Sequence, residues 1–207
     1  MKTNTIIWCA ALAAATLCPG IAAGQSISTT FNSASPSLVV NGRLLSSASY
    51  SNYNSGVMNF DNVTFDAFCV DPFQSISSNQ SLTYQIQDIS TLQNSAIISR
   101  LVGGFLASSQ NASQAAAVQW AIWEVLAETS TSYSLSNGAV KISSTSSATR
   151  DLANTYLANQ ASFTGVQLTY LTNSKSQDMV TWQVVPEPTS AALCAISSLL
   201  LLRRRRK

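Results

Sequence analysis

The sequence predicts an α+β protein, with an antiparallel, sandwich- or barrel-like sheet and a helical segment inserted into it. Strand-like alternation in the first part of the chain gives way to helical spacing in the middle and returns near the end. Both ends look like separate segments, an N-terminal signal-peptide helix and a C-terminal hydrophobic helix. The predicted division is therefore 1–24 signal peptide, 25–185 domain and 186–207 tail.

The first 24 residues have the layout of a secretory signal. Lys2 supplies a positive charge, Ile6 to Leu17 is almost wholly apolar, and the small residues Ala22, Ala23 and Gly24 follow. The alternative, a buried first helix, fits this order less well. We therefore expect export, with cleavage after Ala23 or Gly24.

The first half of the domain predicts short strands. Residues 26–56 are rich in Ser and Thr, and the Ser-rich stretches are interpreted as loops. Asn41-Gly42 lies between two apolar pieces and predicts a hairpin turn. The expected strands are Leu38–Val40, Leu44-Leu45, Val57–Phe60 and Val63–Val70 on either side of Asp61-Asn62, and Leu82–Ile86.

Three helices are expected in the middle of the chain. One runs from Ile89 and ends near Gly103-Gly104, and a third covers Ala148–Asn159. The second, Ala112–Glu128, has Asn111 as its N-cap and Gln114 three residues later, in the capping-box position. Two alternating strands, Val166–Leu171 and Met179–Val185, then close the domain.

Removal of both ends changes the composition of the chain. The precursor carries a formal charge of +2, but residues 25–187 hold five Lys and Arg against nine Asp and Glu, a charge near −4. This balance gives no sign of nucleic-acid binding. The chain has no histidine, which excludes Ser-His-Asp and Cys-His catalysis and the usual zinc sites. Of the four cysteines, only Cys69 lies outside the two ends.

Gln119 is the one polar residue on an apolar helix face. Ala115, Gln119, Ile122, Trp123 and Leu126 are spaced three, four or seven residues apart and share this face. Burying an unpartnered amide costs about 1–3 kcal/mol, so Gln119 needs a specific partner. A satisfied core glutamine and a buried, unreactive Cys69 are the alternatives to a functional role.

Two short motifs around these residues resemble those of bacterial thioester domains. Phe68-Cys69-Val70 matches an aromatic-Cys-aliphatic motif, and Val118 to Trp123 (VQWAIW) matches aliphatic-Gln-x-x-aliphatic-Trp. The resemblance implies that the Cys69 thiol displaces ammonia from Gln119, giving an internal thioester that a partner amine then opens. It also implies that Phe68, Ile122 and Trp123 exclude water. Asp66, Asp71 and Glu124 are the candidate carboxylates for proton transfer, and Asp71 is favoured because it is closest to Cys69 in the sequence.

The tail resembles the PEP-CTERM sorting signal of Gram-negative bacteria. Pro186-Glu187-Pro188 precedes the apolar run 189–202, and Arg203, Arg204, Arg205, Arg206 and Lys207 close the chain. The 14-residue run would form a helix of about 21 Å, too short for a bilayer core of about 30 Å. The resemblance implies transient inner-membrane insertion, cleavage by exosortase, and delivery to the cell surface or the extracellular matrix. A plain C-terminal anchor is the alternative.

Together these features predict a one-shot covalent binder and not a turnover enzyme. The expected partner is a surface amine of a protein or of a matrix polymer, and no cofactor or metal is expected. A non-reactive structural or exopolysaccharide-associated matrix protein is the first alternative, and a hydrolase that uses carboxylates is the second.

Overall fold

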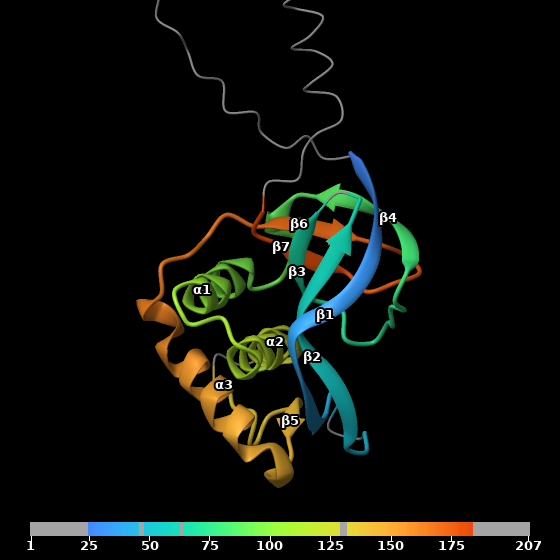
Figure 1. Cartoon of the computed structure of the whole chain (residues 1–207). Coiled ribbons are helices and arrows are strands. Elements are labelled where there is room, and N and C mark those ends of the chain that lie inside the picture. Colours follow the sequence, from blue (N-terminus) through green and yellow to red (C-terminus); the bar gives the residue numbers. More distant parts are fainter. Residues whose placement is uncertain (1–24, 46–47, 63, 129–131, 184–207) are drawn as a thin grey trace, which may run out of the picture.

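The structure is a computed structural model that describes residues 25–45, 48–62, 64–128 and 132–183. The predicted signal peptide and the Pro-Glu-Pro tail lie outside the described residues. The described chain is a mixed α/β structure with one large antiparallel sheet and three α-helices (Figure 1). Within these residues no helix has both the length and the apolar character needed to cross a membrane.

The sheet returns to its own first strand. All pairings are antiparallel, and they run from β1 through β2, β3, β7, β6 and β4 back to β1, with the short β5 added at the far end of β1. The strands are β1 Ser26–Arg43, β2 Ser51–Asp61, β3 Phe65–Cys69, β4 Gln80–Gln87, β5 Lys141–Ile142, β6 Thr169–Thr172 and β7 Met179–Thr181.

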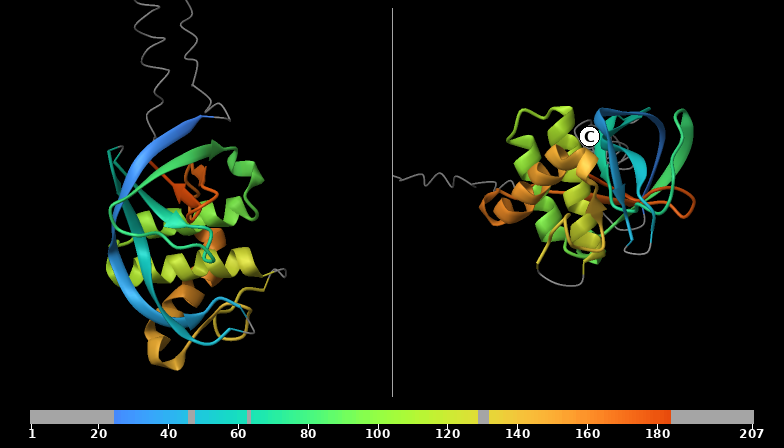
Figure 2. Two further views of the ribbon diagram at one scale, coloured as in Figure 1. Left: turned by 90° about the vertical axis from the view of Figure 1, so that its right-hand side faces the viewer. Right: turned by 90° about the horizontal axis from the view of Figure 1, so that it is seen from below.

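The helices lie together on one side of the sheet, between β4 and β6 in the sequence (Figures 1 and 2). Helix α2 packs against β1 and β2, and it also contacts both other helices. The predicted insertion of a helical segment into an antiparallel sheet is therefore confirmed. The helices are α1 Ser95–Leu106, α2 Ala112–Ala127 and α3 Ser147–Asn159, with 3₁₀ turns at Ile89–Thr91, Ser144–Ser146 and Gln160–Ser162.

Strand β1 corrects the predicted hairpin. Its 18 residues run through Asn41-Gly42 without a turn, and its first part pairs with β4 while its second part pairs with β2. The Ser/Thr-rich residues of β1 form strand and not loop. Thr29 and Phe31 are buried while their neighbours lie at the surface, which is the alternation of a strand with one buried face. One exposed neighbour, Ser28, hydrogen-bonds Thr83 across the β1–β4 pair at 3.1 Å.

Gly42 is required for packing and not for a turn. A Cβ at this position would collide with the indole ring of Trp120 and lie 2.7 Å from the carbonyl oxygen of Lys141. The absence of a side chain thus lets α2 approach the end of β1 closely. Asn41-Gly42 was predicted as a turn because glycine is common in tight turns, but glycine is also common where two segments approach closely.

Helix α1 begins later and ends later than predicted. Ile89–Thr91 forms a separate 3₁₀ turn, and Gly103 and Gly104 lie inside the helix and are buried. A Cβ on Gly103 would collide with the carbonyl oxygen of Thr164, and one on Gly104 would lie 2.6 Å from the ring of Phe163. These glycines admit a neighbouring segment and do not end the helix.

The last two strands are shorter than expected. Strand β6, Thr169–Thr172, begins later than the predicted Val166 and ends one residue beyond the predicted Leu171, and the described part of β7 ends at Thr181. Their place is confirmed: β7 pairs with β3 on one side and β6 on the other. Strand β7 is therefore central in the sheet.

Helix α2 has the predicted cap and a more complete burial than predicted. The Asn111 side chain accepts a hydrogen bond from the Gln114 backbone N–H at 3.0 Å, and Gln114 Oε1 accepts one from the Asn111 N–H at 3.2 Å. Every residue from Ala115 to Val125 is buried, on all sides of the helix. The helix is an interior element and not an amphipathic one, because sheet and helices surround it.

Candidate functional site

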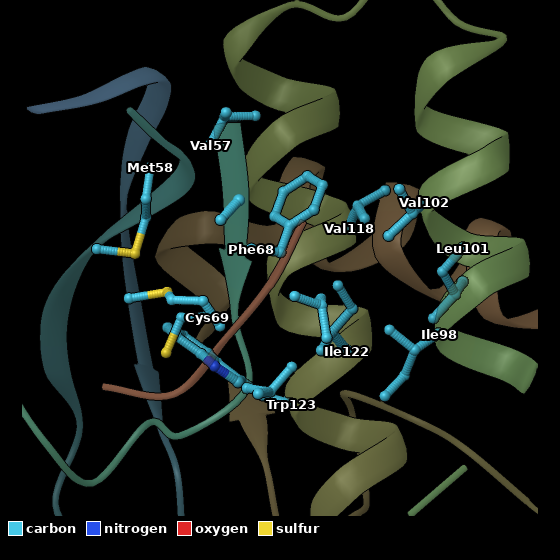
Figure 3. Close-up of a cluster of buried hydrophobic side chains, with 14 of the residues drawn as sticks. Val57, Met58, Phe68, Cys69, Ile98, Leu101, Val102, Val118, Ile122 and Trp123 are labelled. Carbon is cyan, nitrogen blue, oxygen red and sulfur yellow. The ribbon is translucent and has the colours of Figure 1, made fainter. Parts of the chain in front are cut away.

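Cys69 is the last residue of β3 and is 2% exposed. Because side chains alternate along a strand, its thiol shares a face with Phe65. Phe65 stacks on Phe60 at 4.7 Å between ring centroids, and Phe60 contacts Tyr84 edge-on at 5.9 Å. The thiol therefore lies on the same face of β3 as Phe65, and Figure 3 shows Cys69 within the cluster of buried side chains.

The backbone N–H and carbonyl oxygen of Cys69 hydrogen-bond to a side chain, at a position where a neighbouring strand would normally supply the partners. Strand β2 pairs with β3 only as far as Ala67, opposite Met58, while β7 pairs with β3 to its end. Gln119 occupies the vacated side. Its Oε1 accepts from the Cys69 N–H at 3.0 Å, and its Nε2 donates to the Cys69 carbonyl oxygen at 2.8 Å.

These two bonds bring together residues that are 50 positions apart in the sequence. Gln119 is 1% exposed, and both ends of its amide are satisfied by one residue. The carbonyl that a nucleophile would attack already accepts a hydrogen bond from a backbone N–H. That donor is suited to stabilise the negative oxygen of a tetrahedral intermediate.

The thiol itself is protonated in this environment. It donates to the backbone carbonyl oxygen of Asp71 at 3.2 Å. Burial raises the pKa of Cys69 to about 12, and the nearby Asp71 and Asp178 carboxylates also raise it. The Asp71 backbone lowers this pKa, and so does the Trp123 side chain, whose N–H lies near the sulfur without forming a hydrogen bond to it. At neutral pH the protonated thiol therefore predominates over the thiolate.

The other motif residues occupy different positions around the pair. Trp123 lies one turn beyond Gln119 on α2, and its indole is beside the thiol (Figure 3). Ile122 is fully buried on the same helix. Phe68 points to the opposite face of β3, where its ring contacts Phe105 at 5.3 Å. Val70 continues the chain beyond β3, and its N–H donates to the carbonyl oxygen of Asp178 at 2.8 Å.

The three carboxylates considered from the sequence all have other partners. Asp71 Oδ1 accepts from the Phe73 N–H at 3.1 Å, which leaves its backbone carbonyl, and not its carboxylate, as the acceptor for the thiol. Asp66 accepts from the Asn59 amide at 2.8 Å. Glu124 accepts from the Ser134 N–H at 2.8 Å.

Glu124 is a buried carboxyl that the helical pattern did not single out as an interior residue. It is fully buried, and a Cβ on Gly138 would collide with its carboxylate, so the loop around Gly138 closes over it. Burial raises the pKa of Glu124 to about 7. The hydrogen bond from the Ser134 N–H lowers this pKa, and the negative charge of Glu128 raises it. Its neutral form is thus favoured by folding.

Glu124→Gln is expected to change how stability depends on pH. Because the pKa of Glu124 is raised on folding from 4.5 to about 7, its stabilising contribution is complete below pH 4.5 and is lost as the pH rises through 7. The free energy of unfolding of the variant minus that of the wild type should therefore rise by about 1–3 kcal/mol between pH 4.5 and pH 8. Urea unfolding at both pH values measures this, with the exposed Asp151→Asn as control. Parallel pH profiles for wild type and Glu124→Gln would contradict it.

Sequence reasoning missed the residues that reach the thiol from other strands. Tyr84 on β4 is fully buried, and burial raises the pKa of its hydroxyl, with Cys69 among the smaller contributions. Asp178 precedes β7, and its carboxylate accepts from the Tyr170 hydroxyl at 3.1 Å and the Asn173 N–H at 2.8 Å. Leu82, Tyr84 and Ile86 alternate with exposed residues, a pattern that places Tyr84 inside the sheet, but its nearness to Cys69 depends on long-range strand pairing and not on this pattern.

Comparison with protein-family models, with curated proteins and with solved structures finds no match for this chain. Within residues 25–45, 48–62, 64–128 and 132–183, no three His, Cys, Asp or Glu side chains gather closely enough to hold a metal ion. The candidate site therefore rests on the geometry of Cys69, Gln119 and Trp123.

Proposed function

We propose that this protein is an exported covalent binder in which Cys69 and Gln119 form an internal thioester that acylates a partner amine. The closed antiparallel sheet with its helical insertion would be the sandwich- or barrel-like frame of a thioester-type domain. The observation that carries the proposal is the double hydrogen bond between the Gln119 amide and the backbone of Cys69.

The bond would form by displacement of ammonia. The thiol sulfur attacks the side-chain carbonyl carbon of Gln119, the carbon–nitrogen bond breaks, and the thiol proton leaves with the amide nitrogen as ammonia. The Cys69 N–H already lies on the carbonyl oxygen, where negative charge develops. Rotation about the Cys69 Cα–Cβ bond, away from the Asp71 carbonyl, would direct the sulfur toward this carbon.

A partner amine would then open the thioester. The amine nitrogen attacks the same carbon, the carbon–sulfur bond breaks, and the proton released by the amine returns to the sulfur. The product is a stable amide between Gln119 and the partner. A buried site protects the thioester from water before the partner arrives, and Cys69 and Gln119 are 2% and 1% exposed.

An open groove near the site offers a route for the amine. It is lined by residues of β1 and β2 and by the segment that follows Cys69, among them Tyr53, Met58, Pro72 and Phe73. Tyr53 contacts the Trp123 ring edge-on at 6.2 Å, so the groove shares a wall with the site.

The two ends of the chain supply the address in this proposal. The signal peptide at 1–24 would direct export, and the Pro186-Glu187-Pro188 tail with its arginine cluster would direct exosortase processing. The protein would then be held at the surface or in the extracellular matrix of a Gram-negative cell. Its covalent partner would be an amine on a neighbouring protein or matrix polymer.

Intact mass tests the thioester directly. The purified protein is expected to be about 17 Da lighter than its own sequence, because ammonia has been displaced. Incubation with methylamine should convert this deficit to an excess of about 14 Da and expose one alkylatable thiol. A mass equal to the plain sequence, with no change in methylamine, would rule out the proposed bond.

One observation favours a second candidate, a non-reactive structural matrix protein. The same two hydrogen bonds satisfy the Gln119 amide without any covalent bond, and burial holds Cys69 in its thiol form. In that case Gln119 would only complete the edge of β3 that β2 leaves open. The mass measurement separates the two candidates.

A further inference from the structure

The indole N–H of Trp123 is a buried donor without a hydrogen-bond partner among the described residues. Trp123 is only 4% exposed, so water does not solvate this N–H freely. A buried donor without an acceptor is energetically costly, so its presence calls for an explanation. The question is which acceptor it serves.

The position of Trp123 points to the sulfur of Cys69. Trp123 is four residues after Gln119, so both side chains leave the same face of α2. Figure 3 shows its indole nitrogen on the side that faces the Cys69 thiol. A neutral thiol is a weak acceptor, whereas a thiolate accepts a charge-assisted hydrogen bond that is about twice as strong as a neutral one.

We propose that the Trp123 N–H is the donor that stabilises the Cys69 thiolate, both when the sulfur attacks Gln119 and when it leaves during opening by an amine. This assignment rests on the proposed thioester. In the first step the thiol proton departs with the ammonia, and in the second the proton of the amine returns to the sulfur. Trp123 keeps its own proton throughout and only shares it with the charged sulfur.

The other groups near the thiol make this donor necessary. The charges of the Asp71 and Asp178 carboxylates act on Cys69 although these groups hydrogen-bond to other residues, and the Tyr84 hydroxyl also interacts with Cys69 electrostatically. Burial raises the pKa of Cys69, and the two carboxylates raise it further, whereas the Asp71 backbone and the nearby Trp123 side chain lower it. Because the Asp71 carbonyl accepts from the neutral thiol, Trp123 is the side-chain donor placed to meet the thiolate.

The chain contains a matched control for this assignment. Trp120 is also fully buried on α2, and its ring contacts that of Trp123 at 5.3 Å. Its indole N–H donates to Ser55 Oγ at 2.9 Å and therefore serves no sulfur. Trp123→Phe and Trp120→Phe each remove one buried indole N–H while keeping an aromatic ring.

The test compares these two variants with the wild type in methylamine. Trp123→Phe is expected to open its thioester about 10–100 times more slowly at constant pH, because the leaving sulfur has lost its donor. Trp120→Phe should stay within about threefold of the wild type. Equal slowing of both variants, or none in Trp123→Phe, would overturn the assignment of Trp123.

A second readout does not depend on the thioester. In the Gln119→Glu background, which leaves Cys69 as a free thiol, adding Trp123→Phe should slow alkylation by iodoacetamide between pH 8 and 10 about tenfold. Trp120→Phe should not. If Trp123→Phe does not fold, benzothienylalanine at position 123 keeps the bicyclic ring shape and replaces the N–H by sulfur, which cannot donate a hydrogen bond. Absence of the 17 Da deficit in the wild type would refute the proposed thioester, whereas an unchanged alkylation rate would refute the donor alone.

Discussion

Replacing Gln119 by Glu is expected to abolish amine incorporation, with a loss of about 100-fold or more. The substitution preserves the size of the side chain and its carbonyl acceptor for the Cys69 N–H. It removes the ammonia leaving group, because a carboxylate does not react with a thiol under these conditions. The measurement is intact mass before and after incubation with a labelled amine such as dansylcadaverine.

Two further variants complete this experiment. Cys69→Ala should lose labelling equally, because it removes the nucleophile. Gln183→Glu is the matched control: Gln183 also accepts a backbone N–H through Oε1, from Asp66 at 2.8 Å, but it lies apart from the Cys69 thiol. It should label like the wild type. Labelling that persists in Gln119→Glu would place the reactive group elsewhere in the chain.

Trp120→Ala is expected to cause the largest loss of stability, about 3–5 kcal/mol in the free energy of unfolding. Trp120 is fully buried, donates to Ser55 on β2, and contacts Tyr53 edge-on at 5.6 Å. Its ring also fills the space over Gly42 at the end of β1. The substitution would leave a cavity where α2 meets two long strands, and urea unfolding measures the cost.

An exposed aromatic residue provides the control for Trp120→Ala. Phe73 is 64% exposed, so Phe73→Ala removes an aromatic ring without opening a cavity and should change stability by less than about 0.5 kcal/mol. A loss for Trp120→Ala no larger than that of Phe73→Ala would mean that α2 does not anchor β1 and β2 through this ring.

The fold class and the three helices were predictable because their signals are local. The capping box at Asn111 and Gln114 and the alternation around Phe65 depend on neighbours in the sequence. The course of β1 was not predictable in the same way. Its Ser and Thr residues become strand through pairing with β2 and β4, which are distant partners. Likewise, Gly42, Gly103 and Gly104 resembled breaks, but they mark close approaches between segments.

The candidate site was likewise predictable where local residue types decide, and not where long-range contacts decide. Cys69 and Gln119 attracted attention through their residue types, and the structure places them in direct contact. The roles of their neighbours depended on side-chain direction, which the motifs do not contain. Phe68 turns away from the thiol, and the Asp71 carboxylate bonds Phe73, whereas Tyr84 and Asp178 reach the site from strands β4 and β7 or their ends.

The 50-residue separation between Cys69 and Gln119 has a consequence for the fate of the domain after capture. A thioester across this interval would act as a covalent staple on the unfolded chain, and by the entropy rule for cross-links of this length it would add about 4 kcal/mol of stability. Reaction with an amine cuts the staple while attaching the cargo. The loaded domain would thus be easier to unfold than the unloaded one, and limited proteolysis would distinguish the two forms.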